Sequence, residues 1–135
     1  MSFASVRAAL ETALNGIAPP LSTAWENTAF TPVVGTPYQR AVIIPAAPAN
    51  DEIGRAYNER GIFQVSLHFP PNTGPAAAYV RADLIRATFY RGATFPKDGI
   101  TVQVVGTPTI LPPQDDDQGR YVLPVSINFR ASAQT

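Results

Sequence analysis

Hydrophobic and polar positions alternate with a period of two in several segments of the chain, and this period is typical of half-buried strands. The segment 61–69 is the clearest case. Its apolar side chains are Phe63, Val65, Leu67 and Phe69. Segments 100–106 and 120–130 repeat the pattern, and 37–44 is rich in β-forming residues. The pattern predicts four strands, with one face of 61–69 in a core and the other in water or against a partner.

Prolines and long connections set the limits of these strands. Pro45 is expected to end the strand 37–44, because proline removes a ladder donor. Pro124 favours an edge position or a bulge for the strand 120–130 for the same reason. The connections 45–59 and 108–119 are much longer than ordinary turns, and such loops in compact domains are usually functional or disordered.

Two other segments carry apolar residues at three- and four-residue spacing, which predicts helices over 3–16 and from about 73 to 89. Ser2 and Thr73 are the candidate N-caps. The inward stripe expected for the second helix is Ala77, Val80, Leu84, Ala87 and Thr88. Its expected solvent-facing residues are Arg81, Asp83 and Arg86.

Segment 18–36 has no sustained period, and we interpret it as a connector whose Trp25 and Phe30 cover one edge of the core. The resulting order is α-β-β-α-β-β. It predicts an α+β fold in which a four-stranded antiparallel or mixed sheet packs both helices on one face. With 135 residues and no internal boundary, we expect one domain over 1–135.

Composition narrows the possible functions. The formal net charge is zero, with ten basic and ten acidic residues and no basic run, so the electrostatic signature of nucleic-acid binding is missing. The chain has no cysteine, which excludes disulfides and thiolate metal sites. No segment approaches the ~20 apolar residues of a membrane span, and the N-terminus is unlike a signal peptide. We therefore expect production in the cytoplasm and no membrane partner.

Catalytic signatures are missing as well. His68 is the only histidine, Lys97 has no phosphate-loop context, and no Gly-x-Ser-x-Gly elbow occurs. The prediction is a protein that is not an enzyme and takes no cofactor. The run Asp115–Asp117 has three interpretations. The first in rank is a solvated loop tip. The second is an acidic patch that contacts a partner or faces the lumen of an assembly, and the third is a cation site.

The long loops and the polar side of strand 61–69 are the candidate contact surfaces. The stretch 45–60 is either a solvated loop or an arm that orders against a neighbouring subunit, and its tyrosine favours contact. The candidate residues for an interface with another subunit or a partner protein are Arg55, Tyr57, Arg60, Gln64, Ser66, His68, Asp115, Asp116 and Asp117.

Three stretches together resemble a known family: FASVRAALETALNGI, AWENTAFTPVVGTPYQRAVIIPAAP and ERGIFQVSLHFPPNTGPAAAYVRADLIRATF. They are similar to tail terminator proteins of long-tailed bacteriophages, which are neck-region proteins related in fold to the lambda minor tail protein U. The resemblance runs from Phe3 to Phe129 and rests on the order and spacing of its segments. No binding residue is carried across by position.

The resemblance implies a structural virion protein assembled in the host cytoplasm. Six copies would form a ring that caps the tail tube, ends tube polymerisation and offers a surface to the head-side connector. Its partners would be its own copies, the tail tube protein and the connector, with DNA passing through the lumen without sequence-specific binding. Two alternatives stay open: another head–tail connector or head-closure neck protein, and a small ligand-binding or catalytic α+β domain.

Overall fold

The computed structural model describes residues 2–50, 54, 57–117 and 119–133. Two helices and eight strands occur in that part of the chain. The elements are α1 (Phe3–Asn15), β1 (Ser22–Ala24), β2 (Tyr38–Ala49), β3 (Asn58–Phe69), α2 (Ala76–Thr88), β4 (Thr94–Lys97), β5 (Ile100–Val104), β6 (Thr109–Ile110), β7 (Gln114–Asp115) and β8 (Tyr121–Ala133).

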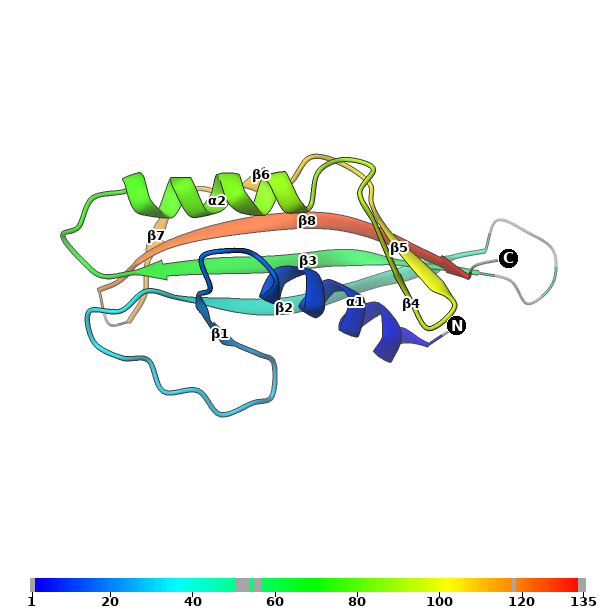
Figure 1. Cartoon of the computed structure of the whole chain (residues 1–135), viewed down its shortest axis with the longest axis horizontal. Helices are drawn as coiled ribbons and strands as arrows, with labels where there is room; N and C mark the ends of the chain where they lie inside the picture. Colours follow the sequence, from blue (N-terminus) through cyan, green and yellow to red (C-terminus); the bar gives the residue numbers. More distant parts are fainter. Residues whose placement is uncertain (1, 51–53, 55–56, 118, 134–135) are drawn as a thin grey trace.

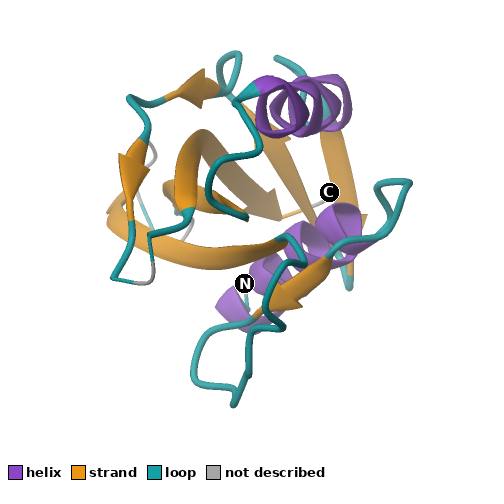
Figure 2. Ribbon diagram, turned by 90° about the vertical axis from the view of Figure 1, so that its left-hand side faces the viewer, coloured by secondary structure: helices purple, strands orange, loops and turns teal. Residues whose placement is uncertain are grey.

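The strands form one mixed sheet in the order β1-β2-β3-β8-β5-β4, and β6 and β7 also pair with β8. Among the described pairs, β1–β2 is the parallel one. The three long strands β2, β3 and β8 run side by side along the molecule (Figure 1), and the sheet is strongly curled when viewed along them (Figure 2). The α+β class is confirmed, but the four-stranded sheet is wrong. The strands missing from the prediction are two to four residues long, too short to show a period.

One hydrophobic core takes side chains from both helices and from the inner face of the sheet. All four apolar residues predicted to point inward from 61–69 are buried. The corresponding inner positions of β8 are also buried: Leu123, Val125, Ile127 and Phe129. The alternation therefore identifies correctly which side of the two central strands faces the core.

The inward stripe predicted for α2 is wrong. Its buried residues are Ala78, Arg81, Ala82 and Ile85. Val80 is instead 61% exposed. Arg81, expected in solvent, is buried, and its guanidinium donates to the Pro19 carbonyl. The helix is so rich in alanine that several phases of the helical period look equally apolar.

Pro45 does not end the second strand, because β2 continues to Ala49. The predicted loop 45–59 is therefore strand at both of its ends, since β3 also begins earlier than expected, at Asn58. Beyond its short pairing with β1, β2 is an edge strand. The amide of Ile43 points away from β3, toward Glu26. The nitrogen of Pro45, two residues later, has the same direction, so its missing hydrogen removes no ladder bond.

Pro124 lies in β8, and β8 is flanked on both sides, so the predicted edge position is wrong. Its register with β3 is continuous through the pair Ser66–Pro124. On the opposite side, the Pro124 carbonyl accepts from the Leu111 amide at 2.9 Å. This position falls between β6 and β7, where the ladder with β8 is interrupted. A missing donor is tolerated there because no regular partner strand faces it.

The helix starts agree in part with the predicted caps. Ser2 is the N-cap residue of α1, although its side chain makes no capping bond. Thr73 does not cap α2: Pro75 occupies the N-cap, and the Thr73 hydroxyl donates to the Pro70 carbonyl at 2.8 Å. Within the described residues, neither helix is long and apolar enough to cross a membrane.

Candidate functional site

A cluster of aromatic and charged side chains is buried at the end of the sheet where β2 begins and β3 ends. Tyr38 and His68 are opposite each other in the β2–β3 register, and their rings stack at 4.5 Å with an interplanar angle of 11°. His68 is only 8% exposed, and its Nδ1 lies 3.1 Å from Oδ2 of Asp116. The prediction that His68 lies on a wet sheet face is therefore wrong.

Arg120 completes this cluster and fixes the connector before β2. Its side chain is 4% exposed, and its two terminal nitrogens donate to the carbonyls of Val33 and Thr36, both at 2.8 Å. The guanidinium carbon also lies 5.1 Å from the centre of the Tyr38 ring. A buried guanidinium needs its donors satisfied, and the two backbone carbonyls accept from them. Arg120 thus holds the two ends of a turn in which Val34 is 95% exposed.

Asp116 ties the β7–β8 turn to the same cluster. Its Oδ1 accepts from the Arg120 amide at 2.9 Å, and the backbones of the two residues are also hydrogen-bonded. Its carbonyl accepts from the Gly119 amide at 3.0 Å, which closes a tight turn containing Asp117. One aspartate therefore joins β3, β8 and the turn between β7 and β8.

The charge state of His68 follows from its surroundings. Burial lowers the pKa of His68 below its ordinary value of 6.5, and the nearby guanidinium groups of Arg40 and Arg120 lower it further, while Asp116 acts in the opposite direction. The neutral ring with Nδ1–H donating to Asp116 is the tautomer that fits this hydrogen bond.

Of the predicted interface residues, the structure brings His68 and Asp116 together and spreads the others. Gln64 and Ser66 lie on the outer face of β3 and are partly exposed, and Arg60, on the same face, is exposed. Tyr57 is exposed just before β3, and Arg55 lies outside the described residues.

The three consecutive aspartates do not converge. Asp115 and Asp117 are exposed, whereas the carboxylate of Asp116 is occupied by His68 and the Arg120 amide. In the part of the chain that the structure describes, no group of three or more His, Cys, Asp or Glu residues is arranged to hold a metal ion. The arrangement favours an anchored Asp116 with a solvated carboxylate on each side of it.

The outer face of the central strands carries arginines from three strands, beside apolar residues such as Ile44, which is 46% exposed. Arg40, Arg60 and Arg130 occupy alternate positions to the buried residues of β2, β3 and β8, and all three are exposed. Arg60 and Arg130 are direct register partners. Sequence reasoning missed Arg120 and Arg130, since a single arginine at either end of a strand has no distinguishing pattern.

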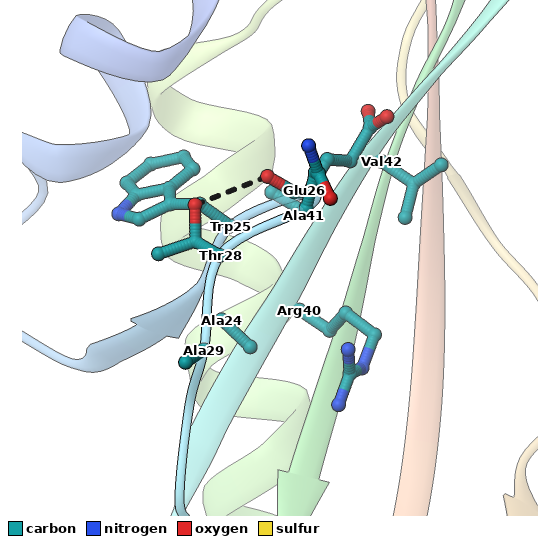
Figure 3. Close-up of a pocket in the computed structure, with 9 residues that line it drawn as sticks. Ala24, Trp25, Glu26, Thr28, Ala29, Arg40, Ala41 and Val42 are labelled. Carbon is teal, nitrogen blue, oxygen red and sulfur yellow. Dashed lines mark hydrogen bonds between the residues drawn. The ribbon is translucent and has the colours of Figure 1, made fainter.

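An open groove of about 580 Å³ lies beside β2 (Figure 3). Trp25 and Glu26 from the connector and Arg40 from β2 are among its lining residues. Oε1 of Glu26 accepts from the Ile43 amide at 2.6 Å and lies 2.7 Å from a terminal nitrogen of Arg7. This carboxylate therefore already has two partners, the Ile43 amide and the Arg7 guanidinium.

Comparisons with known proteins identify the family to which this chain belongs. No curated protein matches the sequence. Eight chains of solved structures match. One of them is 30% identical, with a TM-score of 0.78, and the alignment covers 100% of this chain and 97% of the other. The model of a family described as phage tail terminator protein matches residues 5–129. Because that match spans nearly the whole sequence, the chain belongs to the phage tail terminator protein family.

Proposed function

We propose that copies of this chain close into a ring, with six subunits, that caps the finished tail tube. The ring stops further addition of tube subunits and offers its opposite surface to the head-side connector. Family membership over residues 5–129 is the observation that carries the proposal. In this proposal residues 1–135 act as one unit, and the host cytoplasm is the place of assembly.

The surfaces of the molecule are compatible with such a role. A closed ring with cyclic symmetry uses a head-to-tail contact, so each subunit must present two unlike patches. The outer sheet face carries arginines and the amide of Gln64, while the turn at Asp117 carries exposed carboxylates. Arginine is enriched at protein interfaces, which supports an assembly role for the sheet face. The arm-like β2–β3 hairpin and Tyr57 are further candidates for contact with the tube.

Assembly in solution gives the first test. We expect light scattering from micromolar to near-millimolar protein to reveal a hexamer, with rings visible by negative stain. If the protein is monomeric alone, tail tubes lacking their cap should bind it and stop elongating when tube protein is added. A protein that neither forms rings nor alters tube growth would contradict the proposal. Rings that bind the head-side connector but not the tube would favour the alternative neck component.

A further inference from the structure

Two exposed arginines face each other across the central strands, and this arrangement is unfavourable in an isolated subunit. Arg60 of β3 and Arg130 of β8 are direct register partners on the outer face. Like charges placed opposite each other in a sheet are destabilising. The flanking positions in the same row are Ala46 of β2 and Gln103 of β5, neither of which is acidic.

The two guanidinium groups also retain free hydrogen-bonding capacity. Nε of Arg60 donates to the Ala47 carbonyl at 2.6 Å, which leaves its terminal nitrogens available. Among the ion pairs within the described ranges, none includes Arg60 or Arg130. A pair of adjacent guanidinium forks is well suited to bind carboxylates, since each fork can bind one in a bidentate manner.

Exposed carboxylates occur at the opposite end of the same strands. Asp115 of β7 pairs with Tyr121, and Tyr121 pairs with Phe69 at the end of β3. Phe69 is nine residues from Arg60, or about 30 Å along β3 at ~3.3 Å per residue. Figure 1 shows β7 at one end of the long axis and the close of β8 toward the other. The charged patches thus lie at opposite ends of the subunit.

Hydrogen bonds of Asp116 anchor the backbone at the acidic end. Asp117 lies in the turn closed by the Gly119 amide, and the first residue of that turn, Asp116, is bound by His68 and the Arg120 amide. No described ion pair includes Asp115 or Asp117. An anchored backbone loses little conformational entropy on binding, so the carboxylates of Asp115 and Asp117, on either side of Asp116, are suited to a protein contact.

We propose that Asp115 and Asp117 of one copy dock onto Arg60 and Arg130 of the next copy around the ring. This inference rests on the proposed ring and names the surfaces that close it. The contact is head-to-tail between unlike patches, as cyclic closure requires. It also places carboxylates beside the arginine pair and so converts a repulsive pair into a favourable one. Duplex DNA would fit the arginine pair alone and would leave the acidic turn without a role.

Charge reversal in two separate proteins tests the contact. The first protein carries Arg60→Glu and Arg130→Glu, and the second carries Asp115→Arg and Asp117→Arg. Each alone brings like charges together at every interface, so the concentration for half-assembly should rise by about tenfold or more. An equimolar mixture should assemble again, because alternating copies restore opposite charges at every contact. Arg91→Glu, at an exposed position outside the proposed contact, is the matched control and should leave assembly unchanged.

The outcomes separate this inference from the proposed function. If the wild-type protein forms no ring alone or on tail tubes, both fall. Two outcomes would overturn the docking inference alone, provided that wild-type rings form. In the first, the folded charge-reversed proteins assemble as well as the wild type. In the second, their equimolar mixture fails to assemble. If reversal of the arginines leaves rings intact but abolishes binding of a short DNA duplex, the pair contacts DNA and the inference is again overturned. Circular dichroism of each variant confirms that a lost ring is not a lost fold.

Discussion

Nδ1 of His68 lies 3.1 Å from Oδ2 of Asp116, 48 residues away in sequence, and this contact joins the end of β3 to the turn before β8. The Tyr38 ring stacks on a face of the His68 imidazole. Arg120 then extends the cluster to the carbonyls of Val33 and Thr36. Three segments that are distant in sequence are thereby held around one neutral imidazole.

The lowered pKa of His68 predicts a loss of stability on acidification. The unfolded chain has the ordinary pKa of 6.5, whereas burial lowers the pKa in the folded protein. Between the two values the unfolded chain binds more protons, so the free energy of unfolding falls as the pH drops below about 6.5. His68→Phe keeps an aromatic ring for the stack but does not titrate. The drop in Tm between about pH 7.5 and about pH 5.5 should therefore be smaller in this variant than in the wild type. An equal drop in both proteins would refute this assignment.

Removal of the Arg120 side chain should destabilise the connector before β2. Arg120→Met removes the charged donors to the carbonyls of Val33 and Thr36, and the expected loss is about 2–4 kcal/mol because two charge-assisted bonds disappear. Arg120→Lys should recover only part of it, because an ammonium group does not reproduce the planar fork. Urea denaturation measures the loss, and proteolysis of the 30–37 segment reports its location. The exposed Arg91→Met is the control, expected within about 0.5 kcal/mol of wild type. Equal losses of stability in Arg120→Met and Arg91→Met would contradict the role of Arg120 in holding this connector.

Local patterns are sufficient for the central part of the fold. The alternation in 61–69 predicts both its strand and its buried face, and the helix predicted over 3–16 is found at Phe3–Asn15. These elements are long enough for their period to be read directly. The two-residue strands β6 and β7 escape prediction because their pairing depends on where β8 lies. Neither has a pattern of its own.

The candidate site is harder to predict from the sequence, because it also depends on long-range contacts. His68 alternates correctly with the core residues of its strand, so its pattern indicates an outward side chain. Its burial comes from the connector and the β7–β8 turn, which fold over it and supply Asp116 and Arg120. Nothing in the local sequence around position 68 encodes these long-range contacts. Asp116 is among the predicted contact residues, but its role in fixing the turn depends on partners that only the fold brings near.

Glu26 should protect the open edge of β2. Its Oε1 accepts from the Ile43 amide at 2.6 Å and also pairs with Arg7. Glu26→Ala removes the acceptor and is expected to lower stability by about 1–3 kcal/mol. It also exposes an unpaired strand edge, so aggregation should increase. Glu26→Gln keeps an acceptor oxygen and loses only the half-exposed ion pair, for which about 1 kcal/mol or less is expected. Chemical denaturation measures the loss of stability, and light scattering measures the aggregation. Identical losses of stability in Glu26→Ala and Glu26→Gln would disprove that Glu26 protects the edge of β2 by accepting from the Ile43 amide.

Gly61 is the position where an added methyl group should be least tolerated. A Cβ atom there would lie 2.6 Å from the Ile44 carbonyl oxygen and 3.1 Å from Cζ of Phe129. Gly61 is held between β2 and β8 by its pairs with Pro45 and Phe129, so the backbone has little freedom to move away.

We expect Gly61→Ala to lower the free energy of unfolding by about 1–3 kcal/mol, the usual range for overpacking in a tightly packed interior. Gly106→Ala is the matched control, since a methyl group added there would have no heavy atom within 4 Å and the φ of Gly106 is not positive. That variant should be neutral or slightly stabilising, because alanine reduces the freedom of the unfolded chain. Denaturant titration of both variants measures their free energies of unfolding. If Gly61→Ala is as stable as Gly106→Ala, β2 and β8 must move apart around residue 61 to accommodate the added methyl group.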